Sequence, residues 1–105
     1  MENKIDIKQF CGKNIVTRDD GKIVRDLIED HWNKVNKIEI DFGNVLVASV
    51  SFFDEIFGKL ATKYSRSELT DKIIMENIQD YDRALLNDIL RSRFRQKELN
   101  PEGQI

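Results

Sequence analysis

A chain of 105 residues, of which 40% are hydrophobic and 34% charged, is long enough to form one globular domain with its own core. Its net charge of -2 excludes a general electrostatic attraction to nucleic acid, and its single cysteine excludes an intrachain disulfide or a cysteine-rich zinc site. The first ten residues, MENKIDIKQF, do not form a signal peptide pattern, and no stretch is apolar enough to span a membrane. We therefore expect a cytoplasmic protein.

The N-terminal part of the chain predicts two strands followed by a helix. Apolar residues alternate with polar ones over residues 5–10, which indicates a half-buried strand, and Gly12 marks a turn after it. A second short strand is expected over residues 15–16. Thr17 and Asp20 have the form of a capping box before a helix over residues 18–34. Its apolar residues recur at helical spacing at Ile23, Val24, Leu27, Ile28, Trp32 and Val35.

One glycine lies inside this predicted helix. Gly21 costs about 1 kcal/mol relative to alanine in a helix interior, so we expect an irregular first turn. The alternating stretch KIEIDF over residues 37–42 then predicts a strand, and the pair Gly43 and Asn44 predicts a turn.

The second half of the chain changes from period two to period 3.6 at Ser51. The apolar stripe of the helix that follows predicts a core element and consists of Phe52, Phe53, Ile56, Phe57, Leu60 and Tyr64. Residues 65–71 are polar and loop-like, although Ser65 and Glu68 fit the cap of a short helical turn. A strand over residues 72–77 and a helix over residues 79–96 complete the pattern, and Pro101 and Gly103 end regular structure.

Strands separated by helices of this length indicate crossover connections. We therefore predict the α/β class, with a partly parallel, mixed β-sheet of about four strands covered by about three or four helices. The domain is expected to include residues 1–96, and residues 97–105 are expected to form a flexible tail.

The central stretch IEIDFGNVLVASVSFFDEIFGKL resembles the STAS domain of bacterial anti-sigma factor antagonists, and more closely a STAS-like group of unknown function. In that group a strand ending in Asp-Phe leads through the pattern V...S.SF.DE.FGKL into a helix. The matching residues here are Asp41, Phe42, Val45, Ser49, Ser51, Phe52, Asp54, Glu55, Phe57, Gly58, Lys59 and Leu60.

This resemblance implies a small non-enzymatic regulatory protein that binds a protein partner in bacterial signalling. In the better-known STAS regulators, a kinase related to histidine-kinase-type ATPases phosphorylates a serine at the start of a helix and so changes the partner that is bound. Ser51 is the counterpart by position. The resemblance therefore implies a partner-binding segment made of Ser49, Ser51, Phe52, Asp54 and Glu55.

Ser51 also has a purely structural interpretation. Those regulators usually have Asp-Ser-Ser-Gly, whereas residues 49–52 of this chain are Ser-Val-Ser-Phe. The acid that precedes the serine pair and the small residue that follows it are therefore both missing. Asp54 is placed to complete a capping box with Ser51, and with Glu55 it would repel a phosphate. We therefore favour Ser51 as the helix N-cap and keep phosphorylation as the alternative.

The basic residues near the C-terminus give a second hypothesis of function. Arg91, Arg93, Arg95 and Lys97 alternate around Phe94, and a helix C-terminus favours such cations through its dipole. The alternative is an anion-binding patch at Arg91, Arg93 and Arg95, which would belong to a nucleic-acid-associated protein.

The sequence does not provide a nucleophile, a base and an orienting group in a pattern typical of an enzyme active site. We expect no metal and no cofactor. His31 fits an exposed helical histidine, because no second histidine or cysteine pair is available as a metal ligand. Cys11 fits a small, partly buried apolar residue, because no base is associated with it. The carboxylate pairs at residues 19–20 and 80–82 stand at helix starts, where the dipole favours them.

Overall fold

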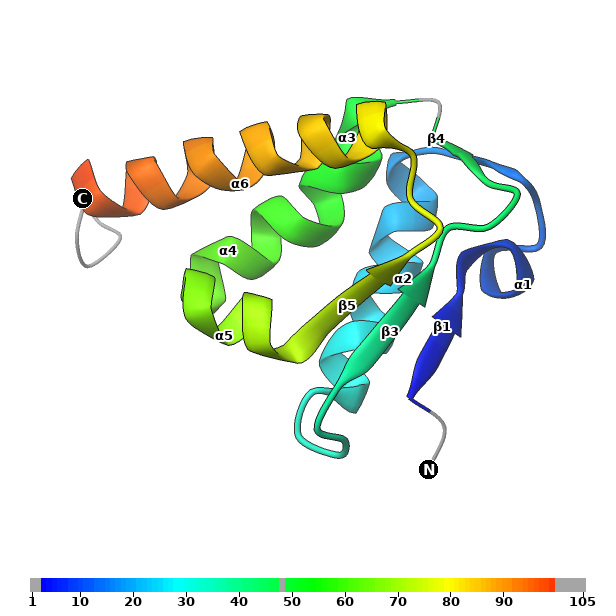
Figure 1. The fold of residues 1–105 in the computed structure, drawn as a ribbon, viewed down its shortest axis with the longest axis horizontal. Helices are drawn as coiled ribbons and strands as arrows, with labels where there is room; N and C mark the ends of the chain where they lie inside the picture. The colour runs from blue at the N-terminus through cyan, green and yellow to red at the C-terminus, as the bar shows by residue number, and fades with distance from the viewer. Residues whose placement is uncertain (1–2, 48, 100–105) are drawn as a thin grey trace.

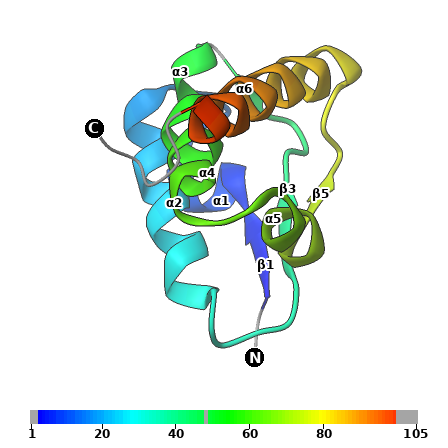
Figure 2. The same ribbon diagram turned by 90° about the vertical axis from the view of Figure 1, so that its left-hand side faces the viewer.

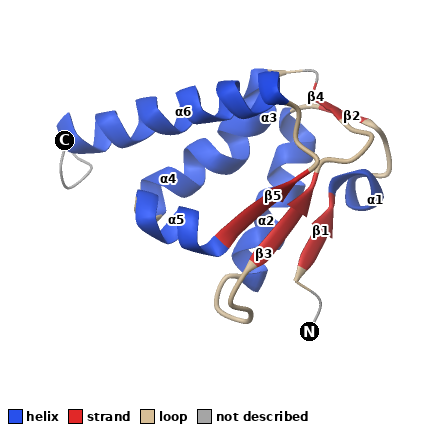
Figure 3. Ribbon diagram, in the orientation of Figure 1, coloured by secondary structure: helices blue, strands red, loops and turns tan. Residues whose placement is uncertain are grey.

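Three parallel strands form the larger sheet of the computed structural model, which describes residues 3–47 and 49–99 (Figure 1). The strands β1 (Lys4–Asp6), β3 (Ile38–Asp41) and β5 (Ile73–Glu76) lie in the order β1-β3-β5. A second, two-stranded parallel sheet pairs β2 (Ile15–Val16) with β4 (Leu46–Val47) (Figure 3). The α/β prediction is confirmed, but the strands form two small parallel sheets and not one mixed sheet, because helical crossovers return each strand in the same direction.

The longest helices lie on one side of the three-stranded sheet (Figure 2). They are α2 (Arg18–His31), a continuous helical segment made of α3 (Val50–Phe53), η1 (Asp54–Gly58) and α4 (Lys59–Lys63), and α6 (Asp80–Leu99), which crosses that segment. The short helix α5 (Arg66–Lys72) leads into β5. No helix in residues 3–47 and 49–99 is long and apolar enough to cross a membrane.

The core lies between these helices and the inner face of the sheet. The strands contribute Ile5, Ile38 and Ile40, and the helical segment contributes the predicted core residues Phe52, Ile56, Phe57 and Leu60, all at most 2% exposed. Their burial confirms the helical stripe predicted from the spacing. The opposite face of the sheet carries alternate residues such as Lys4 and Ile74, which are exposed, so the helices cover only one face.

The strand predicted over residues 5–10 is wrong beyond its first two residues. β1 ends at Asp6, whose side chain accepts a hydrogen bond from the backbone N–H of Gln9 at 3.1 Å and caps the short helix α1 (Ile7–Cys11). Gly12 then ends α1 in the left-handed conformation, with φ at 73°. Ile5 of β1 and Ile7 of α1 are both buried. The alternating pattern therefore arose from two consecutive elements and not from one strand.

Two predicted helix starts are confirmed by their capping contacts. The Asp20 carboxylate accepts a hydrogen bond from the Thr17 backbone N–H at 2.9 Å, and the Glu68 carboxylate accepts one from the Ser65 backbone N–H at 2.7 Å. The second cap starts α5, which continues through a stretch predicted as mainly loop. The expected irregularity at Gly21 is absent, since Gly21 lies within α2. A Cβ atom there would lie 2.8 Å from the Phe52 carbonyl oxygen, so this glycine permits α2 to pack closely against α3.

The C-terminal boundary also differs from the prediction. The helix α6 continues to Leu99, beyond the predicted end at residue 96. Lys97, which was assigned to the tail, donates hydrogen bonds from Nζ to the carbonyl oxygens of Ala61 at 2.8 Å and Tyr64 at 3.2 Å. The rest of the predicted tail, residues 100–105, lies outside the described residues.

Candidate functional site

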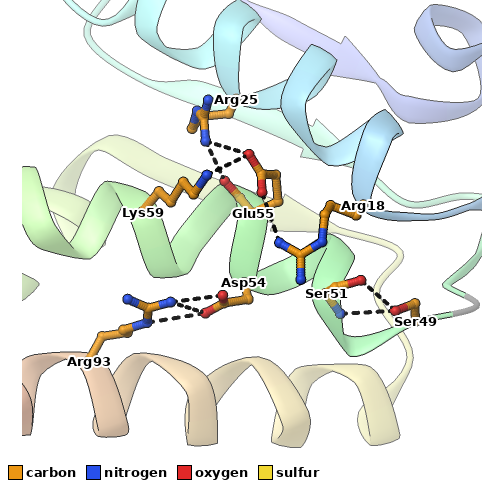
Figure 4. Close-up of polar contacts among 8 residues, drawn as sticks. All are labelled: Arg18, Arg25, Ser49, Ser51, Asp54, Glu55, Lys59 and Arg93. Carbon is orange, nitrogen blue, oxygen red and sulfur yellow. Dashed lines mark hydrogen bonds and ion pairs between the residues drawn. The ribbon is translucent and has the colours of Figure 1, made fainter.

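The helix that carries the family-like motif begins at Ser49 and not at Ser51. Ser49 has an extended backbone, with φ -148° and ψ 137°, and its Oγ accepts a hydrogen bond from the Ser51 backbone N–H at 3.1 Å. The two hydroxyl oxygens lie 2.6 Å apart (Figure 4). The predicted N-cap at Ser51 is therefore wrong, because extended backbone ends two residues earlier than the change of hydrophobic period suggests. Ser51 is partly exposed in the first turn.

Three exposed apolar side chains belong to β2, β4 and the first residue of α3. Ile15 and Leu46 are neighbours across the β2–β4 pair and are 50% and 58% exposed, and Val50, the first residue of α3, is 51% exposed. Figure 3 shows β4 leading directly toward α3. Ile15, Leu46 and Val50 are referred to below as the β2–β4 patch.

Asp54 forms an ion pair with Arg93 of α6 and does not cap the helix. Arg93 donates from Nη2 to both Asp54 carboxylate oxygens at 2.7 and 2.8 Å, and from Nε to Oδ1 at 3.1 Å (Figure 4). Asp54 opens η1, a π-helical stretch, and Gly58 ends it. A Cβ atom on Gly58 would lie 2.2 Å from Asp54 Oδ1, so glycine leaves the room that this ion pair needs.

Glu55 is a buried carboxylate held by three cations. Its oxygens lie 2.7 Å from Arg25 Nη1, 3.0 Å from Lys59 Nζ and 3.2 Å from Arg18 Nη1 (Figure 4). The hydrogen bond from Lys59, together with the positive charges of Lys59 and Arg25, holds the pKa of Glu55 below its ordinary value despite burial. Arg25 Nη1 also donates to the Glu55 carbonyl oxygen at 3.1 Å, which fixes α2 against η1.

These contacts correct the predicted partner-binding segment. Phe52 is fully buried and Glu55 is 5% exposed, so neither side chain is available to a partner. Ser49, Ser51 and Asp54 remain partly exposed. The predicted repulsion of a phosphate also loses its basis, since both carboxylates already have cationic partners.

The three arginines predicted as an anion-binding patch do not share one face. Arg93 is engaged with Asp54, and Arg91 forms an exposed ion pair with Asp88 at 3.0 Å. Residues two apart on an α-helix point in roughly opposite directions, so Arg93 lies away from Arg91 and Arg95. The nucleic-acid hypothesis remains a prediction, without a shared basic surface to support it.

Among the described residues, His31 and Cys11 form no hydrogen bond with the two serines, and each has its own surroundings. His31 is the last residue of α2 and is only partly exposed, with Nδ1 2.8 Å from the Leu27 carbonyl oxygen. Cys11 is partly buried. Burial, and to a smaller extent the nearby negative charge of Asp20, raises the pKa of its thiol. Within the part of the chain that the structure describes, no three histidine, cysteine or acidic side chains form a group suited to a metal ion.

A comparison of the sequence with models of known protein families identifies the family of this chain. The model of the STAS-like domain of unknown function (DUF4325) matches residues 20–83, which include α2 from Asp20 onward, β3, the helical segment from α3 to α4, and β5. The chain belongs to this family. The STAS-like match includes both serines and the Asp54-Glu55 pair but ends before Arg93, the partner of Asp54. Searches of curated proteins and of solved structures gave no significant match.

Sequence reasoning missed the cationic partners of this STAS-like motif. Arg18 and Arg25 lie seven residues apart, two turns along one helix, which is a signal for cations on a common face. Arg93 gave no such signal, because its partner is 39 residues away in the chain. The acidic pair was recognised, but its partners required the tertiary structure.

Proposed function

We propose that this STAS-like protein is a small, cytoplasmic, non-enzymatic regulator that works by binding a protein partner through the β2–β4 patch and the start of α3. The observation that carries the proposal is the exposure of the three patch residues, each at least half exposed, of which Val50 stands in the sequence between two partly exposed serines. An apolar group rimmed by polar residues is typical of a protein interaction site. In the two-stranded sheet, β2 and β4 each pair only with the other among the described residues. Each strand therefore has a free edge to which a strand of a partner can add.

The partner proposed from the STAS resemblance is a histidine-kinase-type ATPase or a related regulator in bacterial signalling. The structure supports binding over catalysis at this helix start because its acidic residues are engaged in ion pairs. Asp54 binds Arg93, and Glu55 binds three cations, so neither carboxylate is a free general base.

The experiment measures the affinity of the purified chain for an ATPase of this type encoded in the same genome, by isothermal titration calorimetry. Leu46→Asp places a charge in the centre of the patch and should weaken binding by at least about tenfold. Ile74→Asp is the matched control, since Ile74 is exposed on the open face of the larger sheet. Equal affinities for the wild type and Leu46→Asp would refute the proposed surface.

A switch at Ser51 is a second proposal for the same surface. Since Ser49 provides the cap, the Ser51 hydroxyl is not required for that role. Ser51 and Glu55 are four residues apart and share a helix face, so Arg18, which bonds to Glu55 and is itself 57% exposed, lies on the side where a phosphate would project. A phosphate group on Ser51 would therefore be attracted by the Arg18 guanidinium and by the positive N-terminal end of the helix.

The switch is tested by mass spectrometry of protein isolated from its own cells and by two variants. Phosphate on Ser51, together with a strong change in partner affinity for Ser51→Asp but not for Ser51→Ala, is the expected result. Similar partner affinities for both variants and the wild type would refute the switch, while leaving the docking surface to its own test at Leu46.

A further inference from the structure

A cavity of about 270 Å³ is lined by residues of η1, α5, β5 and α6, and Figure 1 shows α5 leading into β5 and α6 following it. Five of the eight described lining residues are apolar, and two of them, Phe57 and Leu69, are buried in the core. Polar groups are supplied by Thr70, Arg83 and Asn87. The described lining contains no carboxylate, so Arg83 is the one charged residue in it.

Arg83 differs from the other arginines that contact neighbouring elements. Arg25 and Arg93 each form an ion pair, whereas Arg83 forms none within residues 3–47 and 49–99. It lies in the first turn of α6, after Asp80 and Asp82, and neither of these acids lines the cavity. Arg83 is exposed and supplies the one positive charge among the described residues that line the cavity.

Arg83 and Asn87 are placed to act together. They are four residues apart on α6, so their side chains lie on the same helix face, and both line the cavity. A guanidinium binds a carboxylate through charge-assisted hydrogen bonds, and a neighbouring amide N–H donates to the same group. Apolar walls hold water poorly and favour an apolar ligand body.

We infer that this cavity binds a small free carboxylic acid with an apolar body, whose carboxylate is held by Arg83 and Asn87. The cavity shares no residue with the β2–β4 patch, so the inference is independent of the proposed partner surface. At about 30 Å³ per non-hydrogen atom, the share of one water molecule in the liquid, the volume accommodates roughly nine such atoms. An eight-carbon acid, with about ten non-hydrogen atoms, is close to this size and serves as the probe, whereas a folded polypeptide segment is too large.

The test is an NMR titration of the isotopically labelled chain with octanoate at fixed salt concentration. Saturable shifts are expected in α5, β5 and the first half of α6, and 1-octanol, which lacks the charge, should bind at least about tenfold more weakly. Arg83→Gln should weaken octanoate binding by at least about tenfold, whereas Arg95→Gln, an exposed arginine on the same helix, should change it less than about twofold.

A second variant tests the place of binding without removing a core residue. Thr70 is exposed and lines the cavity, so Thr70→Phe should obstruct it and abolish the shifts while the spectrum stays that of a folded protein. Unchanged binding in Thr70→Phe or in Arg83→Gln, equal binding of octanol, or absence of saturation would overturn the inference. Tighter binding of a short peptide ending in leucine would overturn the assignment to a free acid.

Discussion

Replacing Glu55 by glutamine removes the charge at the centre of the ion-pair cluster while keeping the size of the side chain. The Glu55 carboxylate is 6% exposed and its nearest partner, Arg25, is 16% exposed, so the substitution leaves a largely buried guanidinium with only Glu29, at 3.9 Å, as an ionic neighbour. Breaking a buried pair costs about 3–5 kcal/mol. The glutamine oxygen can still accept one hydrogen bond, so we expect a loss of about 2–3 kcal/mol in the free energy of unfolding.

The other two partners of Glu55 provide matched controls. Arg18 and Lys59 are 57% and 51% exposed, and their charges return to water when the pair is broken. Arg18→Gln and Lys59→Gln should therefore each cost less than about 1 kcal/mol. Urea denaturation at pH 7, followed by the fluorescence of Trp32, the only tryptophan, measures all three variants against the wild type.

The effect of Glu55→Gln should also depend on pH in one direction. Because the folded pKa of Glu55 is lowered, its contribution is fully present above the unfolded pKa of about 4.3 and is lost as the pH falls through the folded value. The difference between wild type and variant should therefore shrink under acidic conditions. A variant within about 0.5 kcal/mol of the wild type at pH 7, or a difference that grows on acidification, would refute this account.

Four further substitutions test the helix that contains this cluster. Ser49→Ala should lower the free energy of unfolding by about 0.5–2 kcal/mol and Ser51→Ala by less than about 0.5 kcal/mol, measured by urea denaturation, because only the first hydroxyl caps the helix; the reverse order would contradict the cap assignment. Gly58→Ala should cost about 1–2 kcal/mol in the same assay even after the gain in helix propensity, because its Cβ displaces Asp54 from its ion pair; a stabilised variant would show that the carboxylate has another position. Phe57→Ala should cost about 3–5 kcal/mol by thermal or urea unfolding, since the ring is 1% exposed, and a normally stable variant would be inconsistent with this core.

Hydrophobic period and capping residues predicted most of the elements, because both are local signals. The stripe from Phe52 to Leu60 required only 3.6-residue spacing, and the Thr17 cap required only an acid three residues later. The same signals failed where two elements meet within a few residues. Asp6 ends a strand and caps a helix at once, and Ile5 and Ile7 on either side of it are both buried, so the pattern was indistinguishable from one strand.

The candidate site was less predictable, because its geometry depends on contacts between distant segments. The sequence identified the acidic pair, but Asp54 reaches Arg93 in the last helix and Glu55 reaches Arg25 in the first long helix. A π-helical stretch has no sequence signal comparable to a cap, and here Gly58 accommodates an ion pair whose existence the local sequence does not reveal. The location of the motif could therefore be predicted, but the accessibility of its residues could not.

The parallel order of β1, β3 and β5 has a consequence for how the chain folds during synthesis. Lys4 pairs with Glu39 and Glu39 pairs with Ile74, so 35 residues separate each strand from its neighbour in the sheet. Ribosomes add roughly 5–20 residues per second, so about 2–7 s pass between the synthesis of one strand and that of its partner. Small domains of mixed α/β type fold faster than this. The pace of translation, and not the pairing of strands, therefore sets how long Ile5, the apolar residue of β1, stays without its sheet.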